Sequence, residues 1–206
     1  MTPYKSEIVA RLNQFFEREG EIQSVSPELE FLVFRGDERV PYNSVFTLGM
    51  SAHPMEGVPD KEWALAELVM ILPLDWPLER DESNWPLRWL ERLAMFPRRE
   101  GSWLSLAHTV PNGIPAQPFA PDTKFAAWLL IPPIEFGPNF PRWRLEDKRV
   151  LNFWAPIPIH ADELALVTNK GATELFNRFA RDGVTDIFDP NRISIYAKKR
   201  GLLGLR

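Results

Sequence analysis

The clearest pattern of hydrophobic and polar positions lies between residues 150 and 192. Hydrophobic side chains at every second position from Leu151 to Ile159 predict a strand over residues 150–159 with one apolar face. Pro156 and Pro158 have the same parity, so their missing N–H groups fall on one edge of this strand. We therefore expect that edge to be unpaired near the end of the strand.

Two helices are predicted after this strand and a turn at residues 160–161. The first covers residues 162–170 and begins with two carboxylates, which suit the exposed N–H groups of a helix start. The second follows Gly171 and ends at Gly183, and its apolar stripe consists of Leu175, Phe176, Phe179 and Ala180. A turn at Asp189-Pro190 then leads to a last predicted strand over residues 193–196.

The rest of the chain intersperses further strands with helices. One helix is predicted over residues 5–19, and another from Trp85-Pro86 to Pro97, capped by Ser83 or Asn84. Strands are predicted over residues 31–35, 45–50, 68–72, 103–110 and 126–131, and loops over 111–123 and 137–147. Because the elements do not alternate strictly, we expect a single α/β (α+β) domain with a mixed β-sheet flanked by helices.

Length and charge limit the classes of function. A chain of 206 residues favours one domain, here 1–206, with a short basic tail over residues 198–206. The net charge of −4 gives no electrostatic reason to expect nucleic acid or an anionic membrane as a partner. The apolar runs are too short to cross a bilayer, and the first residues lack a signal-peptide core. We therefore expect a cytoplasmic protein.

The sequence contains no pattern typical of a metal or cofactor site. Cysteine is absent, which excludes disulfides, thiol catalysis and cysteine ligands. His53, His108 and His160 are far apart in the sequence, and none has a partner four residues away. No glycine-rich phosphate loop is present. We therefore expect no metal and no cofactor, and interpret His160 as a strand-end residue that hydrogen-bonds near the following helix start.

One short motif leaves an enzymatic alternative open. Residues 49–53, GMSAH, partly match the nucleophile elbow Gly-x-Ser-x-Gly, but His53 replaces the second glycine. A serine hydrolase using Ser51 with His108 or His160 and Asp186 is therefore one alternative function. Asp186 and Asp189 have a simpler interpretation as turn residues, since Asp189 precedes a proline.

Several short motifs between residues 45 and 192 occur in an order that resembles the suppressor-of-fused domain family, in its stand-alone bacterial form. The downstream motifs are PIPI (156–159), Glu163, Gly171 with Leu175, and DPxR (189–192). The upstream motifs are TLGMS (47–51) with Pro54-Met55, ELVM (67–70) before Leu72-Pro73, Trp85-Pro86 and AHTVPNG (107–113). The resemblance implies a single domain with a mixed sheet and no enzymatic activity.

The resemblance also implies a protein partner. Animal members grip an extended peptide of a transcription factor, and stand-alone bacterial members resemble immunity proteins or antitoxins that neutralise a toxin. On this basis the expected partner-binding residues are Phe96, Trp103, His108 and Asn112. Ala107 stands where the animal proteins have an acidic residue, so the same peptide specificity is not expected. A regulatory scaffold that binds an extended peptide, without any toxin, is the other alternative.

Overall fold

The computed structural model describes residues 4–79, 81 and 84–197 of the chain. Within these residues the helices are α1 (Lys5–Phe15), α2 (Trp85–Glu100), α3 (Ala161–Lys170) and α4 (Ala172–Asp182). The strands are β1 (Glu21–Ser26), β2 (Leu29–Phe34), β3 (Tyr42–Leu48), β4 (Leu65–Pro73), β5 (Thr109–Pro111), β6 (Phe125–Ile131), β7 (Arg142–Arg144) and β8 (Val150–His160). Two short 3-10 helices are η1 (Met50–Ala52) and η2 (Lys61–Trp63). The predicted basic tail and the candidate cap Ser83 lie outside the described residues.

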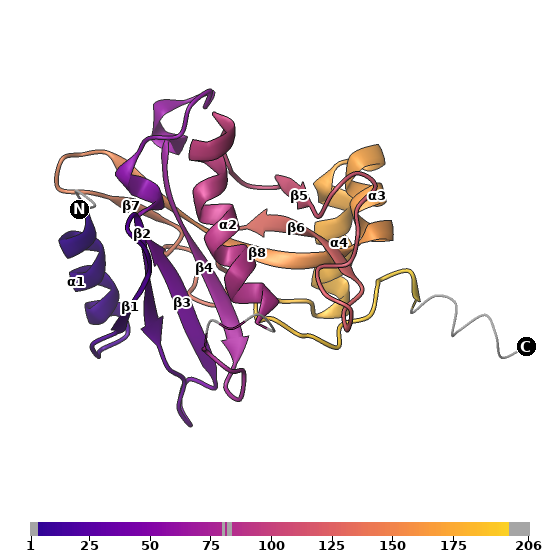
Figure 1. The fold of residues 1–206 in the computed structure, drawn as a ribbon, viewed down its shortest axis with the longest axis horizontal. Coiled ribbons are helices and arrows are strands. Elements are labelled where there is room, and N and C mark those ends of the chain that lie inside the picture. Colours follow the sequence, from indigo (N-terminus) through magenta and orange to yellow (C-terminus); the bar gives the residue numbers. More distant parts are fainter. Residues whose placement is uncertain (1–3, 80, 82–83, 198–206) are drawn as a thin grey trace, which may run out of the picture.

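The strands form one sheet with the order β1-β2-β3-β4-β8-β6-β5, and β7 pairs with β8 beside this path (Figure 1). Among the described strands, β4 and β8 are parallel neighbours, whereas the other neighbours are antiparallel. The predicted mixed sheet flanked by helices is therefore confirmed. β1 and β5 are the two outer edges of the sheet.

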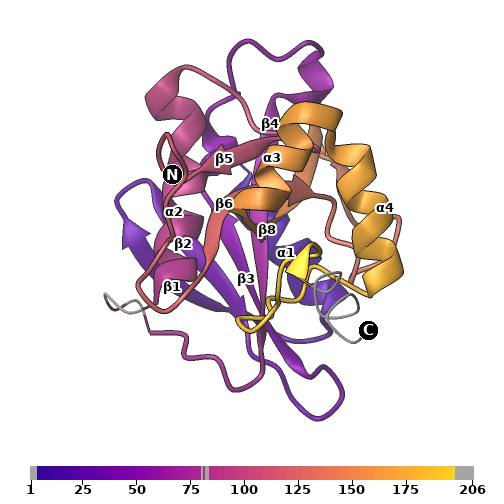
Figure 2. The ribbon, with the colours of Figure 1, turned by 90° about the vertical axis from the view of Figure 1, so that its right-hand side faces the viewer.

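Helices cover both faces of the sheet (Figures 1 and 2). On one face α2 packs through Leu90 into a hydrophobic cluster with the strands. On the other face Ile8 of α1, Leu166 of α3 and Leu175 of α4 belong to a second cluster. β4, β6 and β8 are buried along nearly their whole length, which explains why their sequences are almost continuously apolar.

The edge of β8 at its two prolines is not paired with any described strand, as predicted. β4 pairs with β8 from Leu151 to Trp154, and β6 pairs with the opposite edge over residues 155–160. Beyond Trp154 the guanidinium of Arg192 lies where a strand would continue, and it donates a hydrogen bond to the carbonyl of Pro158 at 2.8 Å. A side chain therefore closes this gap in the sheet.

The predicted end of α2 at Pro97 is wrong. The helix continues through Pro97 to Glu100, and Gly101 ends it in the left-handed conformation, with φ of 55° and its N–H donating to the Pro97 carbonyl. Proline removes one backbone donor but does not prevent another turn after it. Asn84 occupies the predicted cap position, but its side chain donates to the carbonyls of Pro77 and Glu79 instead of capping the helix.

Five other elements also differ from the predictions. The strand expected over residues 103–110 is reduced to β5, and the strand expected over 193–196 is a turn. Two strands, β1 and β7, were not predicted, because their half-exposed and polar sequences lack an apolar alternation. α1 ends at Phe15 and not at residue 19, because Glu17 adopts a left-handed conformation with φ of 53°.

Candidate functional site

A groove lies between α2 and the edge strand β5. Its volume is about 700 Å³, and it is lined by α2, the turn that follows it, β5 and the next loop. Three of the predicted partner-binding residues line it, namely Phe96, Trp103 and His108. All three are partly exposed, and the ring centroids of Trp103 and His108 are 4.3 Å apart. The structure therefore brings these three aromatic side chains together on one concave surface.

The turn between α2 and β5 determines the positions of Trp103 and His108. Leu104 is 1% exposed and fixes the turn to the hydrophobic core, so the neighbouring Trp103 remains at the surface. The backbone N–H of His108 donates to the carbonyl of Ser105 at 3.1 Å, and Ala107 has a positive φ of 66°. This tight turn replaces the first half of the strand that we predicted here, and it brings His108 back beside Trp103.

Asn112, the fourth predicted residue, does not line the groove. Its side-chain amide donates to the carbonyls of Gln117 at 3.1 Å and Pro118 at 2.8 Å. Its backbone N–H donates to the carbonyl of Ala126 at 2.8 Å. Asn112 therefore shapes the proline-rich loop beside the groove, and its amide is already used within the chain.

The outer edge of β5 borders the groove. The carbonyl of His108 accepts from Leu130 and the N–H of Asn112 donates to Ala126, so both groups point toward β6. Backbone groups alternate in direction along a strand, so the N–H and C=O of Thr109 and the C=O of Pro111 point away from β6. This edge therefore offers one donor and two acceptors to an incoming chain.

Two exposed apolar side chains beside β5 were not anticipated from the sequence. Ile114 is 97% exposed in the loop after β5, and Leu106 is 43% exposed in the turn before it. Ile114 also lines the groove. The signal that could have identified Ile114 is its place as one of two large apolar residues, with Phe119, in a loop rich in proline and small residues. Exposed apolar side chains around a concave surface are typical of a protein-interaction site.

The geometry around Ser51 does not fit the hydrolase alternative. Ser51 is fully buried, and its hydroxyl donates to the carboxylate of Glu67 at 2.6 Å. Glu67 also accepts from the Thr47 hydroxyl and from the backbone N–H groups of Gly49 and Ser51. Burial raises the pKa of the Glu67 carboxyl, although these four donors act in the opposite direction. Ser51 is thus buried, and its hydroxyl is bonded to a carboxylate and not to either histidine of the proposed triad.

The two histidines considered for that alternative make other contacts. The ring nitrogens of His160 lie 3.2 Å from the carbonyl oxygen of Lys124 and 3.0 Å from that of Arg192. His160 ends β8, and its backbone N–H donates to the carboxylate of Glu163 in the first turn of α3 at 2.9 Å, which agrees with its interpretation as a strand-end residue that hydrogen-bonds near a helix start. His108 packs against Trp103 in the groove.

The two aspartates of the last turn have different roles. Asp189 accepts from the backbone N–H of Asn191 at 2.9 Å, so its predicted role as a turn residue is confirmed. Asp186 is buried and accepts from the backbone N–H of Glu135 at 3.2 Å, so the same interpretation is wrong for it. Burial raises the pKa of its carboxyl.

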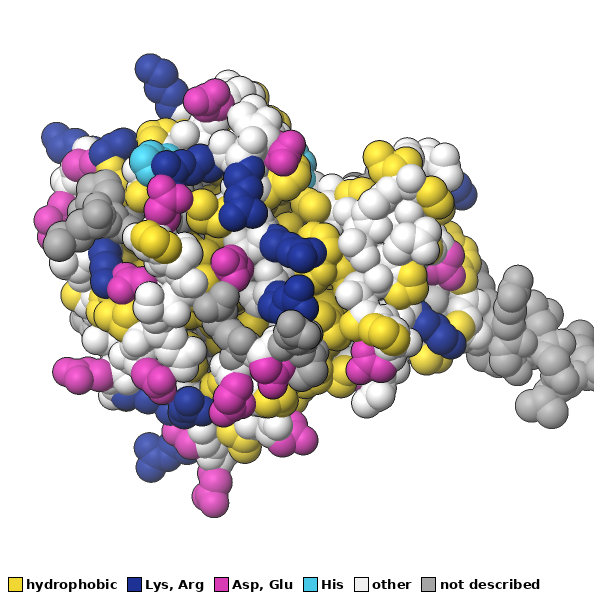
Figure 3. All heavy atoms as spheres, viewed as in Figure 1, with side chains coloured by type: hydrophobic (Ala, Val, Ile, Leu, Met, Phe, Trp, Pro, Cys, Tyr) yellow, Lys and Arg dark blue, Asp and Glu magenta, His cyan; other side chains and the backbone are white. Residues whose placement is uncertain are grey.

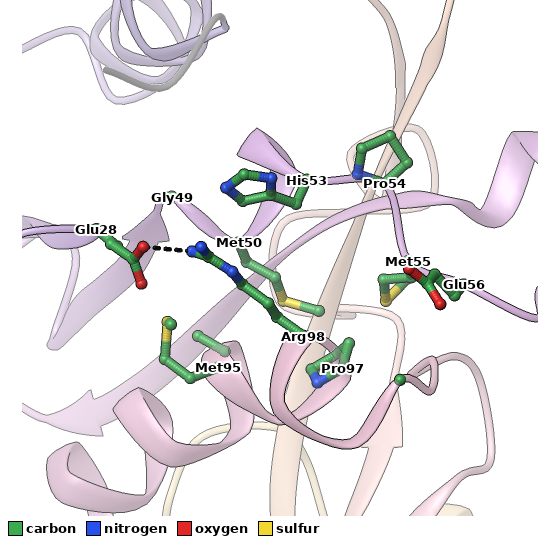
Figure 4. Close-up of a pocket in the computed structure, with 12 residues that line it drawn as sticks. Glu28, Gly49, Met50, His53, Pro54, Met55, Glu56, Met95, Pro97 and Arg98 are labelled. Atoms are coloured by element: carbon green, nitrogen blue, oxygen red, sulfur yellow. Dashed lines mark ion pairs between the residues drawn. The ribbon is translucent and has the colours of Figure 1, made fainter.

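A second concavity of about 360 Å³ lies on the other flank of α2 (Figure 4). Its walls are mixed: Met50, Pro54, Met95 and Pro97 are apolar, and Glu28, His53, Glu56 and Arg98 are polar or charged. The carboxylate of Glu28 and the guanidinium of Arg98 pair within it at 2.6 Å. Arg98 is thus neutralised on this side of the helix, and none of the predicted partner-binding residues lines this concavity.

Neither a metal site nor a membrane segment is found in the part of the chain that the structure describes. No three His, Asp or Glu side chains come together there in a way that could hold a metal ion. No helix within the described ranges has the length and apolar character needed to cross a bilayer.

Comparison with known proteins adds a family match. The family model described as "Suppressor of fused protein (SUFU)" matches residues 26–193, a range that contains the motifs over residues 45–192. An uncharacterized protein of Ureaplasma parvum serovar 3 is 25% identical over 150 residues, which are 73% of this chain and 72% of that protein.

Solved structures show the same fold. A SUFU homologue from Neisseria gonorrhoeae FA 1090 has a TM-score of 0.66 at 17% identity, covering 93% of this chain and 96% of the other. The Sufu-Fu complex has a TM-score of 0.69 at 15% identity, covering 100% and 98%. Drosophila Suppressor of Fused has a TM-score of 0.68 at 16% identity, and the similarity covers 99% of this chain but 54% of that one.

Proposed function

Because the chain belongs to the suppressor of fused family, we propose that it is a non-enzymatic protein-binding domain that holds an extended segment of a partner in the groove beside β5. The observation that carries this proposal is the combination of an aromatic groove of about 700 Å³ with the outer edge of β5. Main-chain groups of a strand edge supply affinity for an extended chain, and side-chain pockets supply specificity. The Sufu-Fu complex, which shares this fold, is an assembly of two proteins.

The bound segment pairs with Thr109 and places apolar side chains against Trp103, His108 and Ile114. The N–H and C=O of Thr109 form two hydrogen bonds with one residue of the segment, as in an antiparallel pair. Ile114 is almost fully exposed, so its burial is worth about 1.5–3 kcal/mol. Pro111 cannot donate, which limits the new ladder to a few residues and makes the side-chain contacts decisive.

The partner that we propose is a toxin made in the same bacterial cell, so that the protein acts as an immunity protein or antitoxin in the cytoplasm. This rests on the resemblance to stand-alone bacterial members and on the bacterial origin of the Neisseria and Ureaplasma relatives. Inhibition then follows from occupation of a toxin surface and needs one inhibitor for each toxin molecule. A regulatory scaffold would use the same groove for a harmless partner.

The test is affinity purification of the tagged protein from its native cytosol, followed by expression of the recovered partner alone. We expect a 1:1 complex with a partner that arrests growth unless the tagged protein is also expressed. Ile114→Ser should weaken the complex roughly 10- to 100-fold. Ile22→Ser on β1 is the matched control, because Ile22 is also exposed and lies at the opposite edge of the sheet.

The possible results test the groove, the antitoxin role and the mode of inhibition separately. A 1:1 partner that is harmless alone supports groove binding and contradicts the antitoxin role. Inhibition that persists at substoichiometric amounts contradicts a purely occupying inhibitor. Equal binding by wild type and Ile114→Ser contradicts the use of the groove.

A further inference from the structure

The groove beside β5 has an unusual charge distribution for a protein with a net charge of −4. Its lining includes no Asp, Glu, Lys or Arg, and His108 is its one titratable side chain. The local charge must therefore come from the elements that border the groove.

The border formed by α2 is basic. Arg92 precedes Phe96 by four residues and Arg99 follows it by three, so both side chains lie on the same flank of the helix as Phe96. Both arginines are exposed. Basic side chains gather in a row over α2 (Figure 3).

These two arginines differ from their neighbour Arg98 in their partners. Arg98 is paired with Glu28 on the opposite flank of the helix. The guanidinium of Arg92 lies over the ring of Trp89 at 5.2 Å, which holds it in place without neutralising it. Arg99 has no ion pair with a residue that the structure describes. Two positive charges therefore remain available beside the groove, and the acidic residues next to them in the sequence of α2 are Glu91, which precedes Arg92, and Glu100, which follows Arg99.

From this charge distribution we infer that the groove selects an extended acidic segment of its protein partner, with Asp or Glu side chains directed at Arg92 and Arg99 and apolar side chains directed into the groove. The inference rests on the proposed function and specifies its ligand. The arginines are seven residues apart, which is about 10 Å along the helix axis. Side chains on one face of an extended chain are about 7 Å apart at a spacing of two residues and about 13 Å apart at a spacing of four. Two carboxylates at either spacing can therefore reach both arginines, whose side chains are long and flexible.

The magnitude follows from the exposure of these charges. Exposed ion pairs contribute about 0.2–1 kcal/mol each, so losing both should reduce affinity roughly 2- to 30-fold. The attraction is screened at high ionic strength, so the affinity should also decrease between low and physiological salt. Replacing Arg98 should have no such effect, because its charge is already paired on the other flank.

The experiment is selection of peptides from a random 12-residue phage library on the immobilised full-length protein. Affinities of the enriched peptides are then measured for wild type, Arg92→Gln/Arg99→Gln, Arg98→Gln and Ile114→Ser. We expect enrichment of Asp and Glu over the unselected library. We also expect a loss of affinity in the double arginine variant and none in Arg98→Gln.

Two failures can be told apart. In the first case, binding of the enriched peptides depends on Ile114, but the peptides show no excess of Asp and Glu or bind Arg92→Gln/Arg99→Gln as tightly as wild type. This result would overturn the acidic preference and leave the groove function in place. If no enriched peptide depends on Ile114, the proposed groove function fails, and the acidic preference fails with it.

Discussion

Removal of Arg192 should destabilise the protein more than removal of any surface arginine. Its guanidinium donates to both carboxylate oxygens of Glu163, at 2.6 and 2.7 Å, and to the carbonyl of Pro158. The side chain of Glu163 is 0% exposed and that of Arg192 is 10% exposed. The pair joins the start of α3 to the chain after α4 and closes the gap beside β8.

The size of the effect follows from the carboxylate that is left behind. In Arg192→Ala, Glu163 keeps the backbone N–H groups of His160 and Ile195 as donors but loses its cation. An unpaired buried charge of this kind costs about 3–5 kcal/mol. Total stabilities are about 5–15 kcal/mol, so the variant should lose at least about a fifth of its stability. Arg192→Lys keeps the charge but not the two-pronged contact, and its loss should be smaller.

The assay is equilibrium unfolding in urea at neutral pH. With a slope of about 2 kcal/mol/M, the midpoint of Arg192→Ala should fall by about 1.5–2.5 M. Glu163→Gln/Arg192→Met removes both charges and should be more stable than Arg192→Ala, because no carboxylate remains unpaired. Arg35→Ala is the control, since the Arg35–Glu21 pair is exposed and should contribute at most about 1 kcal/mol. A loss below about 1 kcal/mol in Arg192→Ala would refute the reasoning.

Two further predictions concern the buried cluster of Ser51 and Glu67. A serine-directed fluorophosphonate probe should not label the folded protein, because Ser51 is buried and donates to Glu67; labelling that disappears in Ser51→Ala would restore the hydrolase alternative. The raised pKa of Glu67 means that stability falls as the pH rises from about 4.5, the unfolded value, to the folded value, and returns as the pH is lowered. The free energy of unfolding of the wild type, relative to that of Glu67→Gln, should therefore decrease as the pH rises through that window. A difference that stays constant with pH would contradict the shift.

The elements predicted correctly are those with local signals. β8, α3 and α4 follow from an alternating run, two helix starts and the glycines at 171 and 183. The end of α2 was misplaced because Pro97 removes a backbone donor without stopping the helix, which continues over three exposed residues until Gly101 ends it. β1 and β7 were missed because they are short, largely exposed strands. Such strands form by pairing with a neighbouring strand and do not need an apolar sequence.

The candidate site shows the same limit more clearly. The sequence identified Phe96, Trp103 and His108 through a family resemblance, and only the fold shows that they line one groove. The pair of Glu163 and Arg192 joins residues 29 positions apart, and a single sequence does not show which charges meet. A sign of the buried cluster was present, because Glu67 is a lone carboxylate within the apolar run of β4. Such a residue needs several donors in the folded protein.

The two outer edges of the sheet differ in a way that favours β5 as the binding edge. β1 carries features that discourage pairing with another chain: a bulge between Ser24 and Ser26, and a charge at Glu21 that is paired with Arg35. The gap beside β8 is protected in two ways: Pro156 and Pro158 have no N–H to donate, and Arg192 occupies the carbonyl of Pro158. β5 has no charged residue and leaves Thr109 facing outward beside an exposed Ile114. β5 is only three residues long and ends at Pro111, so it too can form few main-chain hydrogen bonds with another chain. Our proposal of β5 as the binding edge therefore depends on the side chains beside it, Ile114 and those that line the groove.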